Sequence, residues 1–272
     1  MKIPQALPLL LAVLIALPQA AEARKRERKG KKNVMLELTA YAPDAMAARP
    51  QRERTLKETA TVPQQHARHG KINTHYREGI DVSHYQGNID WETVGKEAKI
   101  AYAYLKATEG AQLVDDTYAR NLREARKAGI SVGSYHFYRP NVSVEEQFLN
   151  LTATVRAEEQ DIVPMIDIEV RGSVSEEKFI ADLRSFIERV ARHYGRKPLL
   201  YTYHNFYNKH FQGEFPGYQW MIARYRPDEP TLNDGTDYIM WQYSSTGRVP
   251  GIRGNCDRSC LMDGFHLSAL QM

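Results

Sequence analysis

The chain of 272 residues lacks a hydrophobic run long enough to span a bilayer. Its most apolar stretch, Leu7 to Leu17, is about half of the ~20 residues that a membrane-spanning helix needs. It follows the basic residue Lys2 and precedes an alanine-rich stretch at 20–23 that offers cleavage sites of the A-x-A type. This pattern predicts a signal peptide over residues 1–23, with a membrane-spanning helix as the alternative, and no cysteine directly follows it to accept a lipid. We therefore expect an exported protein, in the periplasm or outside the cell.

Cysteine is nearly absent, since the chain has only Cys256 and Cys260, in the stretch C-D-R-S-C. A structural zinc site would need further Cys or His ligands, which this tight spacing lacks. In an exported protein an even number of cysteines suggests a disulfide. We expect a Cys256–Cys260 bridge that closes a very short loop, with free thiols or a metal as the alternatives. Nothing else in the sequence indicates a metal or a cofactor.

Most of the chain carries little net charge. The segment R-K-R-E-R-K-G-K-K at 24–32 has seven positive charges and one negative. The whole chain is +4, this segment is +6 and residues 1–23 are neutral, so the remaining residues together carry −2. We therefore expect residues 24–75 to be a basic, mostly disordered linker that can contact anionic wall polymer or membrane. Nucleic acid is not an expected partner of an exported protein.

From residue 78 onward, segments typical of strands and helices alternate. The expected strands are Gly79–Ser83, Ile100–Ala107, Ile130–Tyr138, Val163–Val170, Pro198–Tyr203, Gln219–Tyr225 and Tyr238–Tyr243, and Phe265–Leu270 is a last element that could close the sheet. The expected helices are Trp91–Ala98, Asp115–Ala128, Val144–Glu158 and Ser175–Tyr194. Such alternation implies parallel strands with right-handed crossovers, and about eight strands suggest a closed barrel. The fold class expected for residues 76–272 is therefore α/β, an irregular (β/α) TIM-like barrel with helices short or missing in its last third, present as a monomer.

The stretch M-I-D-I-E-V, Met165 to Val170, places two carboxylates in an otherwise apolar strand. Successive side chains of a strand point to opposite faces, so Asp167 and Glu169 share one face, with Cα atoms ~6.6–6.8 Å apart. Ionised carboxylates are rarely buried without partners. Because active sites of β/α barrels gather at the C-terminal ends of the strands, we expect this pair to face a water-filled mouth there.

Polar and aromatic residues also gather at the expected C-terminal ends of the other strands. Aromatic rings beside carboxylates suit a sugar polymer, whose apolar ring faces stack on them while its hydroxyl groups form hydrogen bonds. Each residue alone has a structural alternative, because a Tyr or Trp in a barrel strand often packs in the core and His136 can be a satisfied structural histidine. Their convergence at one end favours a site. The candidates are Asp81, Tyr135, His136, Tyr201, Trp220 and Gln242.

Five motifs follow one another along residues 78–266. They are G-I-D-V-S-H-Y-Q-G-x-I-D-W, L-K-A-T-E-G, A-G-I-S-V-G-S-Y-H-F, the D-I-E of the fourth expected strand, and W-Q-Y-S-S-T-G-R-V-P-G-I. Together they resemble glycoside hydrolase family 25, the lysozymes of the Chalaropsis type that cleave peptidoglycan at N-acetylmuramic acid. The resemblance implies an irregular β/α barrel, β-1,4-N-acetylmuramidase activity and the glycan strands of peptidoglycan as partner.

The resemblance also assigns roles to single residues. The family's general acid is the Glu of D-x-E, which is Glu169 here, its partner is Asp167, and the first-strand carboxylate is Asp81. A fourth family carboxylate follows the W-Q-Y strand in the pattern V-D-x-N. The segment C-D-R-S stands there in this chain, so Asp257 is the match and Asp263 the alternative. The family's repeat-rich wall-binding modules do not occur in this sequence, which leaves the basic arm as the candidate anchor.

Two other functions stay open on the sequence alone. A non-catalytic protein could keep the barrel and its aromatic cleft to bind wall glycan. Loss of an acidic residue would indicate such a protein, but Asp81, Asp167 and Glu169 are all present. A hydrolase of another aminosugar polymer would carry the same carboxylates, because the sugar's substituents are recognised by loop shape.

The expected export yields a direct prediction. The secreted protein should begin near residue 24, with the basic arm at its N-terminus, because the alanine-rich stretch ends the signal peptide. N-terminal sequencing and intact mass of secreted protein measure this. A protein that keeps Met1 and remains in the membrane would contradict it.

Overall fold

The computed structural model describes residues 76–272. The expected signal peptide at 1–23 and basic linker at 24–75 lie outside the described residues. None of the helices in the described part is long and apolar enough to cross a bilayer.

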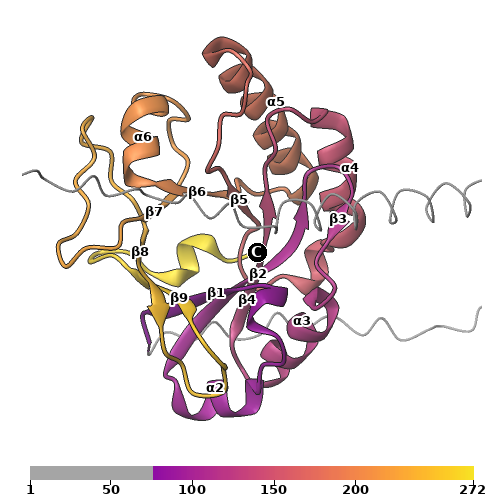
Figure 1. The fold of residues 1–272 in the computed structure, drawn as a ribbon, viewed down its shortest axis with the longest axis vertical. Coiled ribbons are helices and arrows are strands. Elements are labelled where there is room, and N and C mark those ends of the chain that lie inside the picture. The colour runs from indigo at the N-terminus through magenta and orange to yellow at the C-terminus, as the bar shows by residue number, and fades with distance from the viewer. Residues whose placement is uncertain (1–75) are drawn as a thin grey trace, which may run out of the picture. The chain divides into compact units, whose positions relative to one another are not determined.

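Eight strands close into a barrel (Figure 1), which confirms the expected fold class. In chain order they are β1 (Glu78–Val82), β2 (Ile100–Glu109), β4 (Ser131–Phe137), β5 (Met165–Asp167), β6 (Leu199–Tyr203), β7 (Trp220–Ala223), β8 (Met240–Gly247) and β9 (Cys256–Leu261). Neighbouring strands from β1 to β8 are parallel, whereas β9 is antiparallel to both β8 and β1 and so closes the ring. The short β3 (Leu113–Val114) pairs only with the end of β2.

The helices lie outside the barrel, and after the long α5 only the short α6 follows in the described chain. They are α2 (Trp91–Glu97), α3 (Tyr118–Lys127), α4 (Val144–Thr154), α5 (Glu176–Tyr194) and α6 (His204–His210). The longest, α5, begins after Ser175, whose hydroxyl accepts a hydrogen bond from the Lys178 backbone amide at 3.3 Å. It ends at Gly195, which adopts the left-handed conformation with φ of 66° that favours glycine. Between β7 and β9 the described chain forms no helix, as the sequence predicted.

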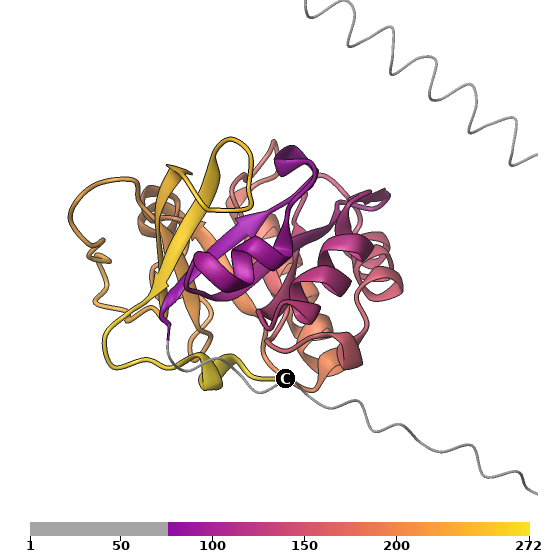
Figure 2. The same cartoon turned by 90° about the horizontal axis from the view of Figure 1, so that it is seen from below.

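The last segment differs from the expectation. Phe265–Leu270 does not close the sheet, because β9 takes that position nine residues earlier. Leu267–Leu270 instead forms the 3-10 helix η3, whose Leu267 and Leu270 are buried at the end of the barrel opposite the strands' C-terminal ends. The Val163 backbone amide donates to the Leu270 carbonyl at 2.7 Å and ties η3 there. Figure 2 shows η3 and the C-terminus together at this end.

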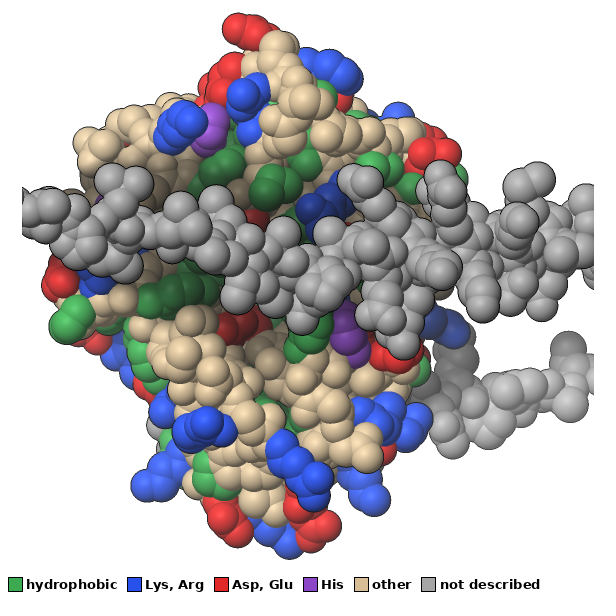
Figure 3. All heavy atoms as spheres, viewed as in Figure 1, with side chains coloured by type: hydrophobic (Ala, Val, Ile, Leu, Met, Phe, Trp, Pro, Cys, Tyr) green, Lys and Arg blue, Asp and Glu red, His purple; other side chains and the backbone are tan. Residues whose placement is uncertain are grey.

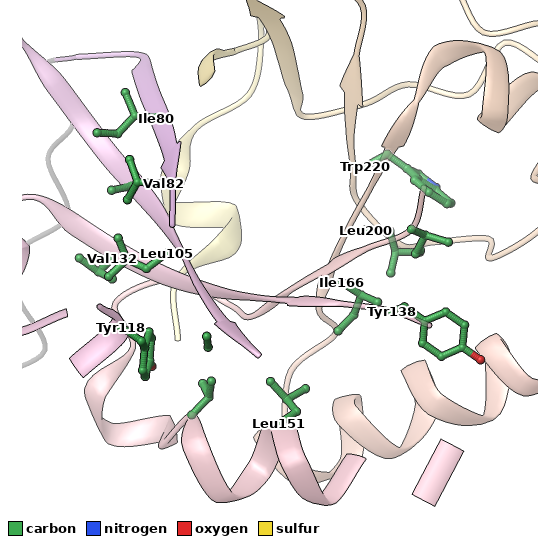
Figure 4. Packing of buried hydrophobic residues seen from close by; sticks show 14 of the residues in the cluster. Ile80, Val82, Leu105, Tyr118, Val132, Tyr138, Leu151, Ile166, Leu200 and Trp220 are labelled. Carbon is green, nitrogen blue, oxygen red and sulfur yellow. The ribbon is translucent and has the colours of Figure 1, made fainter. Parts of the chain in front are cut away.

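Alternation of side chains along the strands builds two apolar layers. Residues that point outward, including Ile80, Leu105, Ile166 and Leu200, pack against the surrounding helices (Figure 4). Residues that point inward, such as Tyr104 and Met165, fill the barrel. Burying apolar area on both sides of the strands is what stabilises such a barrel.

The same alternation shows that two residues predicted to bind substrate are structural. His136 lies between Tyr135 and Phe137 on β4 and points outward, where it contacts Thr108 at 2.8 Å and Gln147 at 3.3 Å. Burial lowers the pKa of His136 to about 4, so the ring is neutral. Trp220 also points outward from β7 and packs against Tyr207, with ring centroids 5.0 Å apart. Neither side chain faces the barrel mouth, because each stands one residue out of phase with it.

The predicted disulfide is wrong, since Cys256 and Cys260 are both free thiols in the structure. The two residues stand four apart on the extended strand β9, which places their Cα atoms about 13 Å from each other. A disulfide needs Cα atoms within about 7 Å. The short loop that the sequence suggested does not exist, because C-D-R-S-C is the closing strand itself.

The position of Trp220 predicts a loss of stability when its ring is removed. Trp220→Ala should lower the free energy of unfolding by about 3–5 kcal/mol, because a side chain that is 1% exposed leaves a large cavity. Urea denaturation measures this. Tyr85→Ala is the control, because that ring is 81% exposed and its removal should change stability by no more than about 0.5 kcal/mol. Equal stability of the two variants would show that Trp220 is not a core residue.

Candidate active site

A pocket of about 220 Å³ opens at the C-terminal ends of the strands, and we call it the carboxylate pocket. Figure 3 shows acidic side chains in a hollow near the middle of this face. Its lining residues come from seven strands or the segments directly after them, and include Asp81 (β1), Lys106 (β2), Tyr135 and Phe137 (β4), Asp167 and Glu169 (β5 and the segment after it), Tyr201 (β6), Gln242 (β8) and Asp257 (β9). Convergence from so many strands is typical of a barrel active site.

Strand register explains why these side chains meet. Asp81 on β1 pairs directly with Asp257 on β9, so the two carboxylates face the same mouth. Asp167 is the last residue of β5, and Glu169 follows two residues later on the same side. The pocket is therefore formed by side chains that the normal alternation along each strand directs into the barrel.

Two of the carboxylates are deeply buried and only partly satisfied. Asp81 is 6% exposed and Asp167 is 7% exposed. Within the described part of the chain, the Oδ1 atom of each is buried without a hydrogen-bond partner. A buried acceptor without a partner costs free energy, and protonation of the carboxyl group reduces that cost.

Burial raises the pKa of every carboxyl group in the pocket. The pKa of Asp81 rises to about 8, because burial and the charge of Asp257 outweigh a hydrogen bond from Gln242. Burial also raises the pKa of Asp257, to about 6. The pKa of Asp167 is raised well above its usual value by burial and by the charge of Glu169. Burial raises the pKa of Glu169 as well, although the nearby Tyr203 hydroxyl partly offsets this. The pocket therefore retains protons at pH values where exposed carboxylates have lost them.

Gln242 holds Asp81 in place. Its Nε2 donates to Asp81 Oδ2 at 2.9 Å, and its Oε1 accepts from the hydroxyl groups of Tyr201 at 2.9 Å and Tyr225 at 2.7 Å. The two phenol donors orient the amide, because only the oxygen can accept from them. Gln242 was predicted to bind substrate, but its oxygen and one amide hydrogen already serve the protein.

Lys106 is the single cation among the residues that line the carboxylate pocket. Its Nζ contacts Glu109 Oε2 at 2.6 Å, and Glu109 Oε1 in turn accepts from Arg139 Nε at 3.0 Å. The ammonium group also lies 5.4 Å from the centre of the Phe137 ring. This fixed positive charge lowers the pKa of both Asp167 and Glu169 and so opposes the effect of burial.

The structure brings most of the predicted site residues together. Asp81, Tyr135, Asp167, Glu169, Tyr201, Gln242 and Asp257 all line the carboxylate pocket. His136 and Trp220 do not, for the reason of phase given above. Asp263 is also elsewhere, since its side chain is fully exposed and contacts Arg77 at 2.6 Å.

Two aromatic residues near the pocket were not predicted. Phe137 lines it and stands two residues after Tyr135, so the period of two could have identified it. Tyr225 lies beyond the end of β7, where the phase of a strand gives no guide, and only its contact with Gln242 connects it to the site.

Among the described residues, no group of three or more His, Cys, Asp or Glu side chains is arranged to hold a metal ion. The carboxylates of the pocket are set beside aromatic rings, with Tyr85, Tyr203 and Tyr225 exposed at and near its rim.

Carboxyl groups with raised pKa values at the mouth of a β/α barrel, beside exposed aromatic rings, are typical of a glycoside hydrolase. Residues 80–252 match the family model "Glycosyl hydrolases family 25", and the chain belongs to this family. It is a glycoside hydrolase of the lysozyme type.

Relatives agree with this assignment. The chain is 36% identical over 183 residues to the "Uncharacterized protein YegX" of Escherichia coli K12. The matched region covers 66% of this chain and 67% of the relative. It is 32% identical over 204 residues to "Lysozyme M1" of Streptomyces globisporus, covering 70% of this chain and 69% of the relative. The solved structure of the bacterial lysozyme from Streptomyces coelicolor superposes with a TM-score of 0.64 at 30% identity, covering 73% of this chain and 96% of that one.

The raised pKa of Asp81 predicts a stabilising substitution. Because the folded protein binds this proton more tightly than the unfolded chain, the stability that it contributes is fully present below about pH 4 and is lost as pH rises through about 8. Asp81→Asn cannot ionise and keeps an acceptor for Gln242. Calorimetry should give a Tm several degrees above wild type at pH 8 and no gain at pH 4.

Asp116→Asn is the matched control for this measurement, because Asp116 is exposed. Its Tm should follow that of wild type at both pH values. A gain for Asp81→Asn that is equal at pH 4 and pH 8 would show that ionisation of Asp81 is not what costs stability.

Proposed function

We propose that this enzyme is exported and hydrolyses the β-1,4 bond between N-acetylmuramic acid and N-acetylglucosamine in peptidoglycan. The observation that carries the proposal is the pair Asp167 and Glu169, placed together at the barrel mouth with pKa values raised by burial. Hydrolysis of a glycosidic bond needs one group that delivers a proton to the leaving oxygen and another that stabilises positive charge developing on the sugar. Names of relatives such as "Lysozyme M1" and "Autolytic lysozyme" support the substrate.

Glu169 is the proposed general acid. It is half-buried, whereas Asp167 is 7% exposed and deeper in the pocket, so Glu169 stands nearer to the position of a scissile bond at the rim. The proton of Glu169 goes to the glycosidic oxygen as the bond to the anomeric carbon breaks. The carboxylate that remains then takes a proton from the water that completes hydrolysis.

The pair shares a proton in a way that substrate controls. Burial raises the pKa of both carboxyl groups, and because the two interact they titrate as a unit. An amide N–H of the substrate that donates to the carboxylate of Asp167, which lines the pocket, favours its ionised form. Binding therefore favours the form in which Asp167 is ionised and Glu169 holds the proton that the reaction uses.

That amide belongs to the 2-acetamido group of the sugar in this proposal. A carboxylate at Asp167 holds the group so that its carbonyl oxygen bonds to the anomeric carbon as the leaving oxygen departs. Water then attacks the same carbon and releases the acetamide. Asp81 and Asp257 also line the pocket. Asp257, whose pKa of about 6 leaves it ionised at neutral pH, balances the developing positive charge.

The basic arm at 24–32 is proposed to hold the exported enzyme near anionic wall polymer. Its net charge of +6 acts over about a Debye length, ~8–10 Å at ordinary salt. The catalytic barrel at 76–272 contains all of the proposed catalytic residues.

Two substitutions separate the proposed roles. Glu169→Gln should lower the rate of peptidoglycan cleavage by about 10²–10⁴-fold, because the leaving oxygen loses its proton donor. On an aryl glycoside whose leaving group needs no proton, the same variant should lose much less. Asp167→Asn should slow both substrates to a similar degree. Turbidity loss of peptidoglycan and release of the aryl group measure the two rates.

Glu188→Gln, an exposed Glu on α5, is the control and should match wild type on both substrates. Near-wild-type cleavage of peptidoglycan by Glu169→Gln would overturn the assignment of the acid. The bond is identified from the new reducing end: muramic acid supports the proposal, whereas glucosamine there, or no cleavage, contradicts it.

A further inference from the structure

A second and larger pocket, of about 810 Å³, lies beside the carboxylate pocket, and we call it the basic pocket. It is formed by the end of β6, by α6, by the end of β7 with the segment after it, and by the segment after β5. Its lining residues are Arg171, Gly172, Tyr203, His204, Asn205, Phe206, Lys209, His210, Ala223, Arg224, Tyr225 and Arg226. Figure 3 shows Lys, Arg and His side chains gathered on this face beside α6.

The charge of the basic pocket is opposite to that of its neighbour. Four of its lining residues are Arg or Lys and none is Asp or Glu, whereas four carboxyl groups line the carboxylate pocket. Arg171 and Arg224 are held by acidic partners that stand outside the lining, Glu176 at 3.6 Å and Asp228 at 2.7 Å. Lys209 and Arg226 are exposed. The pocket therefore suits an anionic ligand.

Two tyrosine rings of the basic pocket also contact residues of the carboxylate pocket, and we call them the tyrosine wall. Tyr203 and Tyr225 line the basic pocket and stand edge to face, with ring centroids 6.2 Å apart. On its other side the wall meets the carboxylate pocket, where Tyr225 donates to Gln242 and Tyr203 lies 6.2 Å from Tyr201. A ligand that occupies one pocket and extends past these rings enters the other.

We propose that the basic pocket binds the carboxylates of the stem peptide carried by the muramic acid of the substrate. This inference rests on the proposed function, which places a muramyl residue in the carboxylate pocket. The peptide is joined to that sugar through its lactyl ether and carries free carboxylates. An extended peptide advances about 3.3–3.6 Å per residue, so three of its residues reach about 10 Å from the sugar.

Charge complementarity favours the stem peptide over a separate wall polymer. The peptide is covalently attached to the sugar at the reacting centre, so its binding is intramolecular once the glycan is bound. A free anionic polymer would lack this advantage. The basic pocket therefore selects glycan that still carries its peptides, while the carboxylate pocket performs the hydrolysis.

The test compares two soluble glycan substrates that are free of other wall polymers. One carries stem peptides, and the other is the same material after an amidase has removed them. In the full mature protein, the double variant Lys209→Gln/Arg226→Gln should lower the ratio of kcat/KM for peptide-bearing over peptide-free glycan by about tenfold, through KM, because charged hydrogen-bond donors to the carboxylates are lost. Added salt should lower the same ratio in wild type and affect the variant less.

Arg123→Gln/Lys127→Gln is the matched control, since it removes two exposed positive charges from α3 and should leave the ratio at the wild-type value. An unchanged ratio in an active Lys209→Gln/Arg226→Gln variant would overturn the inference alone, and so would an equal loss on both substrates. A loss seen only with whole walls that carry anionic polymer would assign the pocket to that polymer and overturn it too. If wild type cleaves neither glycan, the proposed function fails first and the inference fails with it.

Discussion

The structure depends on how side chains alternate between the inside and the outside of a small closed barrel. Eight strands that join into a ring send every second side chain to the inside, where there is little room. Over most of the strands' length that interior is filled by residues such as Tyr102, Tyr104 and Met240. At the C-terminal end the same phase continues into Asp81, Asp167 and Asp257, which therefore meet in one pocket. The carboxylate cluster is an extension of core packing with a change of side-chain chemistry.

That change has a cost which the rest of the barrel must offset. Carboxyl groups that are less than a tenth exposed lose hydration, and two of their oxygens gain no partner in return. The structure limits the cost with one amide and one ammonium group. Gln242 is oriented by two phenols so that it can only donate to Asp81, and Lys106 supplies one positive charge near Asp167 and Glu169. These partners do not fully offset burial, so the pKa values of the carboxyl groups stay raised, as acid catalysis requires.

The sequence reveals the fold and the carboxylates because both follow from short-range patterns. The alternation of strands and helices predicts the barrel, and D-I-E on one strand places two carboxylates on one face. The wrong predictions concern which face of the barrel a side chain takes and which segment forms the closing strand. Tyr135 and His136 are neighbours of similar chemistry, and only pairing with β2 and β5 decides which of them faces inward. Trp220 is ambiguous for the same reason. Its outward contact with Tyr207 of α6 is a tertiary contact, which the local sequence does not reveal.

The closing strand shows a different limit. C-D-R-S-C-L is polar on its inward face, where Asp257 enters the pocket and Ser259 accepts from the Tyr102 hydroxyl at 3.0 Å. A strand whose inner face serves a site does not show the apolar alternation by which strands are recognised. Its two cysteines then suggest a covalent loop, although they stand on the outward face of a strand and are too far apart to bond.

The tyrosine wall lies between an acidic and a basic pocket at this end of the barrel. Acidic groups with raised pKa values lie on one side of Tyr203 and Tyr225, and arginine and lysine side chains lie on the other. If these charges shared one open cavity, they would pair and lower the pKa of the acids on which the proposed chemistry depends. Two aromatic rings keep them apart over a short distance, and their exposed faces still allow a sugar to stack. On the proposed function, one substrate can therefore meet a proton donor on one side of the wall and basic side chains on the other, without either group neutralising the other.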